Sequence, residues 1–426
     1  MDFKDKKVLV SGIAKSGISA AGLLKKLGAD VTVQDAKTED KLGDVTDELR
    51  SQGFNLYLGA NPDAIIEDMD ILVMSPGVPT DLPFVNKARE KNIPVIGEIE
   101  LAYMFCKSPV IGITGTNGKT TTTTLAGDIC KAYFENTFVV GNIGNPFADI
   151  TFETKDDGVV VAELSSFQLE TINEFKPKVS AVLNITPDHL NRHHTLENYI
   201  AAKERVFENQ DESDFCILNY NDEITRKMAD KTKADVIFFS LGGKITEGIY
   251  SDEKSIYINA LGYNEKVVDI DELKILGGHN VENAMAAIGC CAAIGVPLDI
   301  IRKVLKEFTA VEHRIEYVRT INDIEFYNDS KGTNPDASIK AVEAMKRPIC
   351  IIAGGYDKGS DFTEWIDTFK GRVKFVAVIG AVKDKITATL DKAGFTNYKT
   401  ADTFEEAIDL CYKNAVPGDW VLLSPA

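Results

Sequence analysis

The stretch that decides the fold runs Val110-Ile-Gly-Ile-Thr-Gly-Thr-Asn-Gly-Lys-Thr-Thr-Thr-Thr-Thr124. Its first residues predict a buried β-strand, a loop with glycines follows, and a helix opens at the Lys-Thr pair. Backbone N–H groups of such a loop, together with the helix N-terminus, form a concave anion site. The pattern is a variant of G-x-x-x-x-G-K-[ST], because Ile113 takes the first glycine position. We therefore predict a P-loop that handles a nucleoside triphosphate.

Short β-branched runs alternate with helical patterns on both sides of this loop, which is typical of parallel sheets covered by helices. Strands are predicted at 7–11, 31–35, 71–74, 93–96, 110–113, 158–162, 179–183, 215–218, 324–327, 349–352, 375–379 and 420–423. Short alternating segments at 235–275 predict antiparallel hairpins, and helices are predicted at 281–294 and 298–308. We expect three α/β domains in series: a Rossmann-like unit at 1–95, a P-loop ATPase-type unit at 96–310 and a second Rossmann-like unit at 311–426.

Length and composition narrow the class of protein. The chain has 426 residues, more than the roughly 250–300 that one hydrophobic core serves. A net charge of −18 argues against nucleic-acid binding, which favours a basic surface. The seven cysteines form no C-x-x-C pair, as expected of reduced thiols in the cytoplasm. With no signal peptide and no apolar run near the ~20 residues of a membrane helix, we expect a cytoplasmic protein without a membrane span.

Several strands of the central unit end in residues that suit phosphate chemistry. Lys119 of the P-loop can reach the β- and γ-phosphates, and the Thr120 hydroxyl can bind Mg²⁺. Glu163 ends a strand where P-loop enzymes place a second Mg²⁺ ligand, although a strand-end acid can be purely structural. His189 follows the next strand and Lys203 lies on the helix beyond it. On the residues alone, these two also fit a structural histidine and an ordinary helical lysine.

The loop Thr114-Gly-Thr-Asn-Gly-Lys-Thr-Thr121 resembles that of the Mur ligases and their relatives, the folylpolyglutamate synthases. Further segments extend the resemblance over the whole chain: Glu163-Leu-Ser-Ser-Phe-Gln-Leu169, Asn184-Ile-Thr-Pro-Asp-His189, Gly277-Gly-His-Asn280 and Asn328-Asp-Ser-Lys-Gly-Thr-Asn-Pro335. The resemblance implies an ATP-dependent ligase of cell-wall (peptidoglycan) synthesis. Such an enzyme activates a carboxylate as an acyl phosphate and then joins it to an amine, and closure of the third domain gates the reaction.

The resemblance also implies roles for residues around the nucleotide. Two Mg²⁺ ions would be held by Thr120, Glu163, His189 and Lys203, the lysine being carbamylated to a carboxylate-like group. Carbamylation needs an unprotonated amine and hence a depressed pKa. ATP contacts are implied for Gly115, Thr116, Asn117, Gly118, Lys119, Thr120, Thr121, Asn280, Asn283, Arg314 and Asp329. Helix capping is the alternative role for the two asparagines near 280.

The first domain carries Gly12-x-Ala14-x-x-Gly17 after a strand, with Asp35 ending the next strand. This form of G-x-G-x-x-G is weak evidence for NAD, and a UDP-sugar presents a pyrophosphate to the same kind of loop. The resemblance implies that UDP-N-acetylmuramoyl-L-alanine binds here and along the central unit. Its contacts would be Lys15, Ser16, Asp35, Lys37, Ser75, Gly77, Asn142, Ser165 and His189.

The amino acid added follows from the segments Glu163–Leu169 and Gly354-Gly-Tyr-Asp-Lys358, which are similar to those of the D-glutamate-adding members. Contacts to D-glutamate are implied for His313, Lys331, Thr333, Lys358 and Ser424. The chain stops at Ala426, inside the segment that holds the D-glutamate carboxylate in the family, so we expect the third domain to be truncated.

A ligase of the family that adds another amino acid is the alternative. The sequence shows no features typical of a P-loop switch or motor. A non-catalytic UDP-sugar binder would not need Glu163, His189 and Lys203 together. We expect a monomer.

Overall fold

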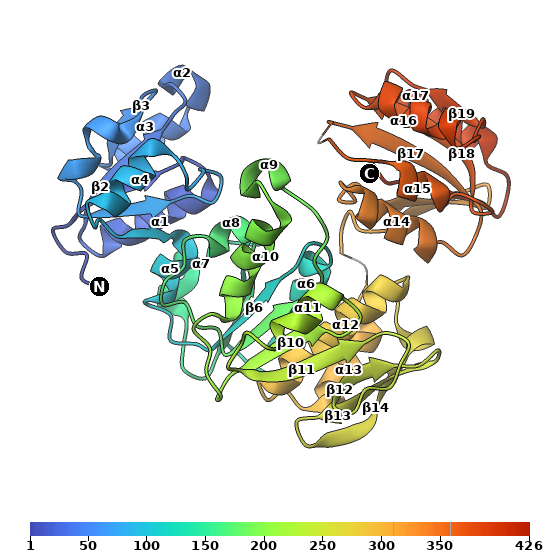
Figure 1. Cartoon of the computed structure of the whole chain (residues 1–426), viewed down its shortest axis with the longest axis horizontal. Coiled ribbons are helices and arrows are strands. Elements are labelled where there is room, and N and C mark those ends of the chain that lie inside the picture. Colours follow the sequence, from blue (N-terminus) through green and yellow to red (C-terminus); the bar gives the residue numbers. More distant parts are fainter. Residues whose placement is uncertain (310, 358) are drawn as a thin grey trace.

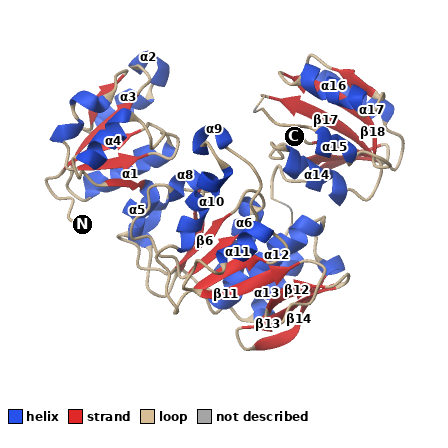
Figure 2. Ribbon diagram, in the orientation of Figure 1, coloured by secondary structure: helices blue, strands red, loops and turns tan. Residues whose placement is uncertain are grey.

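The computed structural model describes residues 1–309, 311–357 and 359–426. Three β-sheets follow one another along the chain, and each is covered by helices (Figures 1 and 2). The central unit lies between the other two in Figure 1. The predicted fold class, three α/β units in series, is confirmed. Within these described ranges, no helix is long and apolar enough to cross a membrane.

The first sheet has five parallel strands in the order β3-β2-β1-β4-β5. The strands are β1 (Lys7–Ser11), β2 (Asp30–Asp35), β3 (Asn55–Leu58), β4 (Ile71–Met74) and β5 (Val95–Gly97). The helices are α1 (Lys15–Lys26), α2 (Glu39–Leu42), α3 (Val45–Ser51), α4 (Pro83–Glu90) and the 3₁₀ turns η1 (Pro62–Ala64) and η2 (Ile66–Asp68). Strands β1 and β4 lie inside the sheet and are buried almost throughout, as their unbroken apolar runs predict.

The turn from β1 into α1 requires two of its glycines. Gly12 has φ +102°, a left-handed conformation that L side chains avoid. A Cβ added to Gly17 would lie 1.9 Å from the Gly12 carbonyl oxygen. Helix α1 can therefore start directly over the end of β1 only because Gly17 has no side chain.

The central sheet has nine strands in the order β14-β13-β12-β11-β10-β9-β6-β8-β7. The strands are β6 (Val110–Thr114), β7 (Thr137–Gly141), β8 (Val159–Glu163), β9 (Val179–Val182), β10 (Phe215–Asn219), β11 (Asp235–Ser240), β12 (Gly248–Ser251), β13 (Ser255–Ala260) and β14 (Tyr263–Asp269). Only the β12–β13 and β13–β14 pairs are antiparallel. The predicted hairpins are therefore real, but β11 and β12 still pair in parallel.

The helices of this unit cover both faces of the sheet. They are α5 (Glu98–Tyr103), α6 (Lys119–Lys131), α7 (Phe147–Ile150), α8 (Ser166–Leu169), α9 (Leu190–His193), α10 (Leu196–Glu204), α11 (Glu223–Met228), α12 (Gly278–Ala293), α13 (Leu298–Glu307) and the turns η3 (Thr151–Glu153), η4 (Arg205–Phe207) and η5 (Ile270–Glu272). Helix α12 begins three residues before its predicted start, because Gly277, with φ +91°, lets the chain turn into it.

The third sheet has six strands in the order β15-β16-β20-β17-β18-β19, and only β15 runs antiparallel to its neighbour. The strands are β15 (Glu316–Ile321), β16 (Ile324–Asn328), β17 (Ile349–Gly355), β18 (Val373–Gly380), β19 (Tyr398–Thr400) and β20 (Trp420–Leu423). The helices are α14 (Pro335–Ala344), α15 (Thr363–Asp367), α16 (Lys383–Lys392) and α17 (Phe404–Asn414).

The cores of the three units are not equally separate. One apolar cluster joins the N-terminal unit to the central unit through α1, α5 and α7, with Leu24, Leu101 and Phe147 fully buried in it. The C-terminal unit has its own cores, built around residues such as Trp365 and Phe375. The first two sheets are therefore held together by apolar packing.

Candidate active site

The P-loop has the conformation that its glycines predict. Helix α6 begins at Lys119, and Gly118 before it has φ +85°. Gly115 has φ +145°, and a Cβ there would lie 3.0 Å from the Leu183 side chain. Asn184 holds the loop from the end of β9: its Oδ1 accepts from the Asn117 backbone N–H at 2.8 Å, and its Nδ2 donates to the Asn117 carbonyl at 3.0 Å. The loop backbone is thereby fixed in place.

Lys119 lies back against this loop. Its Nζ donates to the carbonyl oxygens of Gly115 at 2.8 Å and Thr116 at 2.7 Å. Burial lowers the pKa of Lys119, while the nearby Glu163 carboxylate opposes that shift and Arg314 adds to it. The structure thus brings together the predicted lysine, the predicted acid of β8 and an arginine of the C-terminal unit.

Glu163, the last residue of β8, has one carboxylate oxygen without a partner. Its Oε1 accepts from Asn142 Nδ2 at 2.7 Å, but Oε2 is buried and unpaired. Such an oxygen suits a cation ligand. The described residues contain no group of three or more His, Cys, Asp or Glu that could hold a metal. Glu163 with Thr120, the second residue of α6, fits Mg²⁺, which is often bound by one or two protein ligands together with phosphates and water.

Lys203 of α10 is buried beside Lys119. Its Nζ donates to Gly115 O at 2.7 Å and lies 4.7 Å from the centre of the Tyr199 ring. Burial and, after it, the positive charge of Lys119 lower the pKa of Lys203 well below its usual value. Asp188, which is not among the residues predicted from the sequence, opposes this shift and the shift of Lys119. Its position just before His189, in the loop between β9 and α9, was the available signal.

Two nearby histidines have different surroundings. His189 has φ +53° and precedes α9; its half-exposed ring has Nε2 3.6 Å from Asp188 Oδ2. His193 is buried, and its Nε2 shares a 2.9 Å hydrogen bond with Ser166 Oγ. Burial lowers the pKa of His193. The accessible His189 is therefore a better candidate than His193 for a metal ligand.

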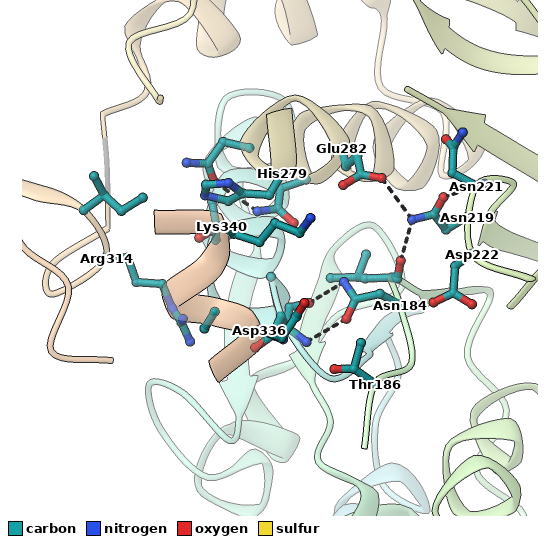
Figure 3. Close-up of a pocket in the computed structure, with 18 of the residues that line it drawn as sticks. Asn184, Thr186, Asn219, Asn221, Asp222, His279, Glu282, Arg314, Asp336 and Lys340 are labelled. Atoms are coloured by element: carbon teal, nitrogen blue, oxygen red, sulfur yellow. Dashed lines mark hydrogen bonds between the residues drawn. The ribbon is translucent and has the colours of Figure 1, made fainter. Parts of the chain in front are cut away.

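A cavity of about 300 Å³ lies between the central and C-terminal units (Figure 3). Seven residues predicted to contact ATP line it: Asn117, Gly118, Thr121, Asn280, Asn283, Arg314 and Asp329. Polar residues that were not predicted also line it, among them Asn219, His279, Glu282, Asp336 and Lys340. Figure 3 shows the side chain of Glu282 joined to Asn219 on one side of the cavity, with Asp336 and Arg314 on the C-terminal side.

The two asparagines of α12 form a chain of hydrogen bonds towards the P-loop. Asn283 Nδ2 donates to Asn280 Oδ1 at 3.0 Å, and Asn280 Nδ2 donates to Leu276 O at 2.7 Å. A Cβ on Gly118 would lie 2.2 Å from Asn283 Oδ1. The residue that caps α12 is Gly277, so neither asparagine is the helix cap.

The C-terminal unit contributes Arg314 and Asp329. Arg314 Nε is buried without a partner. Asp329 accepts from Ser424 Oγ at 2.9 Å, and burial raises the pKa of its carboxyl to about 7. The Ser424 hydroxyl is itself fully buried and shares a 2.8 Å hydrogen bond with Ser338 Oγ. Ser424 thus lies behind Asp329 and supports it.

The other residues predicted to contact the amino acid lie at the surface of this unit. His313 Nδ1 is 2.8 Å from Asn328 Nδ2, and the Lys331 backbone N–H donates to His313 O at 3.2 Å. The side chains of Lys331 and Thr333 are exposed. Lys358 lies outside the described residues.

A second cavity, of about 460 Å³, lies in the N-terminal unit, and two of the predicted substrate contacts, Asp35 and Gly77, line it together with Gly12 of the glycine turn. The Asp35 carboxylate accepts the backbone N–H groups of Ile13 and Lys37, both at 2.9 Å, so its oxygens hold the cavity wall.

The remaining predicted substrate contacts are divided between the two units. Ser75 is buried against Gly12, and Lys15 Nζ reaches Gly144 O of the central unit at 2.7 Å. Ser16 is the second residue of α1 and is partly exposed. Ser165 caps α8 through Gln168.

The P-loop has an acid nearby, and the cavity beside it lies between the central and C-terminal units. These features are those of an ATP-using enzyme. The chain belongs to the Mur ligase family. Three family models match in succession: the Mur ligase MurD-like N-terminal domain at residues 6–97, the Mur ligase middle domain at 113–291 and the Mur ligase glutamate ligase domain at 313–426.

Curated relatives match over the whole chain. The UDP-N-acetylmuramoylalanine–D-glutamate ligase of Lachnospira eligens is 49% identical over 426 residues, covering 100% of this chain and 95% of the relative. The ligase of that name from Clostridioides difficile is 48% identical, with 100% and 94% covered. Among solved structures, the UDP-N-acetylmuramate-alanine ligase of Thermotoga maritima shares the fold, with a TM-score of 0.62, 21% identity and 99% and 96% of the chains covered.

Proposed function

We propose that the chain is the ATP-dependent ligase that adds D-glutamate to UDP-N-acetylmuramoyl-L-alanine in the synthesis of peptidoglycan precursors. Full-length identity of 49% to a ligase of that name supports the choice of substrates. The observation that carries the chemistry is that Lys119 of the P-loop lies within the electrostatic influence of Glu163, which has a buried, unpaired carboxylate oxygen, and of Arg314 from the C-terminal unit.

The reaction needs an activated carboxylate, because joining a carboxylate to an amine in water is unfavourable. The L-alanine carboxylate attacks the γ-phosphate, the bond from that phosphorus to the ADP oxygen breaks, and an acyl phosphate forms. The amine of D-glutamate then attacks the acyl carbon, loses a proton and releases phosphate. Lys119, Arg314 and the P-loop N–H groups hold the phosphoryl oxygens and neutralise their charge, since positioning and electrostatics dominate phosphoryl transfer. Bound Mg²⁺ supplies further charge neutralisation.

We place two Mg²⁺ ions at this site, one with Thr120 and Glu163 and one with His189 and Lys203. A carbamylated Lys203 would supply the carboxylate that the second position needs. The lowered pKa of Lys203 supports this, because only the neutral amine captures CO₂. The test is the Lys203→Ala variant. Short carboxylic acids added to it should restore part of the lost activity, and a variant that they do not restore would count against carbamylation.

The three units divide the substrates among them. We assign the UDP end to residues 1–95, ATP to 96–310 and D-glutamate to 311–426, with the amino acid held by His313, Lys331, Thr333 and Lys358. The substrates are cytoplasmic metabolites, so we place the enzyme in the cytoplasm, acting as a monomer.

Phosphate release with UDP-N-acetylmuramoyl-L-alanine, ATP and one amino acid at a time tests the proposal. We expect release that requires both substrates and is fastest with D-glutamate. Preference for L-alanine, L-glutamate or a diamino acid would assign the chain to another ligase activity of the family. Release without any amino acid would contradict ligation altogether.

A further inference from the structure

Arg192 joins the N-terminal and central units beside the proposed active site. It is the third residue of α9, in the central unit. Its Nη2 donates to Val78 O at 3.0 Å, and its Nη1 donates to Pro76 O at 3.4 Å. Both carbonyls belong to the loop after β4, in the N-terminal unit. A single guanidinium therefore spans the two units.

Glu170 completes this contact from the end of α8. Its Oε2 accepts from Arg192 Nη2 at 2.9 Å and from Thr80 Oγ1, in the N-terminal unit, at 3.1 Å. Its Oε1 lies 3.4 Å from His193 Nδ1. The side chains of Arg192 and Glu170 are only 14% and 17% exposed, so water screens the pair weakly. We call these two residues the Arg192–Glu170 clasp.

The same arginine is connected to His189 through an aromatic ring. The guanidinium carbon lies 4.5 Å from the centre of the Phe167 ring, within the range of a cation–π interaction. The Phe167 ring is 5.0 Å from the His189 ring and stacks on His193 at 5.3 Å. Arg192 thus contacts both the N-terminal loop and the aromatic group that supports His189.

The loop that the clasp holds is a wall of the N-terminal cavity. Gly77, Val78 and Pro79 line that cavity. The Val78 side chain also packs on the turn after β1, where a Cβ on Gly12 would lie 2.9 Å from Val78 Cγ2. A shift of this loop would therefore move the cavity wall relative to His189 and the P-loop.

We propose that Arg192 and Glu170 are positioning residues. They fix the loop after β4, a wall of the cavity that we assign to the UDP substrate, against His189. This inference rests on the proposed ligase function. The clasp sets the distance between the held UDP end and the reacting carboxylate. Its loss should impair use of the UDP substrate. Use of ATP should be spared, because the ATP cavity is built by the P-loop, α12 and the C-terminal unit.

The experiment compares Arg192→Ala, Arg192→Lys, Glu170→Ala and the double alanine variant of the full chain. Arg302→Ala is the matched control: Arg302 also donates to a carbonyl, Val267 O at 3.2 Å, and to a carboxylate, Asp299 Oδ1 at 2.8 Å, but on the remote helix α13. We measure KM for each substrate, kcat, thermal stability, and calorimetric binding of UDP-N-acetylmuramoyl-L-alanine.

We expect Arg192→Ala to raise KM and Kd for the UDP substrate about tenfold, as the loss of charged hydrogen bonds does, with KM for ATP changed less than about twofold. Arg192→Lys should give KM and Kd values between those of wild type and Arg192→Ala, since lysine keeps the charge but cannot donate the several hydrogen bonds of the planar guanidinium. The double variant should be no worse than Arg192→Ala alone, because the two residues act as one unit.

Four outcomes would each overturn the proposal. In Arg192→Ala, these are an unchanged KM for the UDP substrate or an equal rise in KM for ATP. The others are effects that multiply in the double variant and wild-type behaviour of Arg192→Lys. If the wild-type chain forms no product with D-glutamate, the proposed function fails instead. Calorimetric binding of the UDP substrate then still decides whether the clasp positions it.

Discussion

Asn117 of the P-loop donates from Nδ2 to Oδ2 of Asp336 at 2.6 Å, across 219 residues of sequence. Asp336 is the second residue of α14, so this hydrogen bond joins the phosphate loop of the central unit to the C-terminal unit. Asn334 Nδ2 adds a longer contact to Asn117 Oδ1 at 3.4 Å. The nucleotide cavity is thus closed by side chains that reach the P-loop itself.

Replacing Asp336 by alanine should lower kcat/KM for ATP about tenfold. The change leaves the half-buried Asn117 amide without its acceptor, and an unmade hydrogen bond of this kind costs about 1–3 kcal/mol. Steady-state phosphate release measures it. Glu343→Ala is the control, because this exposed residue of the same helix has only a 3.5 Å contact to Lys340 as its ion pair. Equal effects of the two substitutions would show that the contact to the P-loop is unimportant.

Glu163→Gln should abolish the response to Mg²⁺. The amide keeps the shape of the side chain and can keep a hydrogen bond to Asn142, but it cannot supply a charged ligand at the buried Oε2 position. We expect kcat to fall by at least about 100-fold, in the range seen when a group that stabilises transition-state charge is removed. A titration of phosphate release with Mg²⁺ checks this. The idea fails if the variant has the wild-type Mg²⁺ midpoint.

The two glycines of α1 should respond oppositely to alanine. Gly17→Ala places a methyl group 1.9 Å from the Gly12 carbonyl, so the turn into α1 has to move, and a loss of more than about 3 kcal/mol is expected. Gly22→Ala meets nothing within 4 Å and should stabilise the chain by about 0.5–1 kcal/mol. Urea denaturation of the two variants gives the comparison. A destabilising Gly22→Ala would show that α1 is constrained in a way that this packing does not explain.

Glu98 should make stability depend on pH. Burial raises the pKa of its carboxyl to about 7, against a smaller opposing effect of the 2.6 Å hydrogen bond from the Ala148 N–H. The native chain therefore keeps this proton up to pH about 7, whereas the unfolded chain releases it near pH 4.5. The contribution of Glu98 is fully present below pH 4.5 and is lost as pH rises through 7.

Glu98→Gln removes that dependence. Relative to wild type, the variant should gain up to about 3 kcal/mol between pH 4.5 and pH 8. Urea denaturation at several pH values measures the gain. Glu90→Gln, at an exposed position of α4, should show no such change. A pH-independent difference between Glu98→Gln and wild type would contradict the assignment.

The sequence predicted those parts of the fold that depend on local patterns. Strands such as β4 and β6 are buried apolar runs. The glycines of the P-loop predict its conformation. Four strands escaped prediction: β3, β7, β15 and β19. They are short or partly exposed, and β15 is exposed along almost its whole length, so no run of buried residues marks them.

The site was predictable where one motif carries both position and chemistry. Glu163 ends strand β8, and Lys119 begins helix α6 after the loop that follows β6. Both therefore lie at the carboxyl ends of the parallel strands. Asp336 was not predictable, because its role depends on where α14 docks on a loop far away in sequence. Likewise, Ser424 is predicted to contact D-glutamate, and only the fold shows that its buried hydroxyl donates to Asp329.

The apolar cluster that runs through α1, α5 and α7 has a consequence for how the enzyme works. Rotation of the N-terminal unit against the central one would expose that cluster to water, whereas the C-terminal unit has cores of its own. The chain should therefore melt as two cooperative blocks, with the UDP and ATP sites in the same block. We therefore expect the first two units to keep one relative position during turnover and the C-terminal unit, to which we assign the amino acid, to move against them.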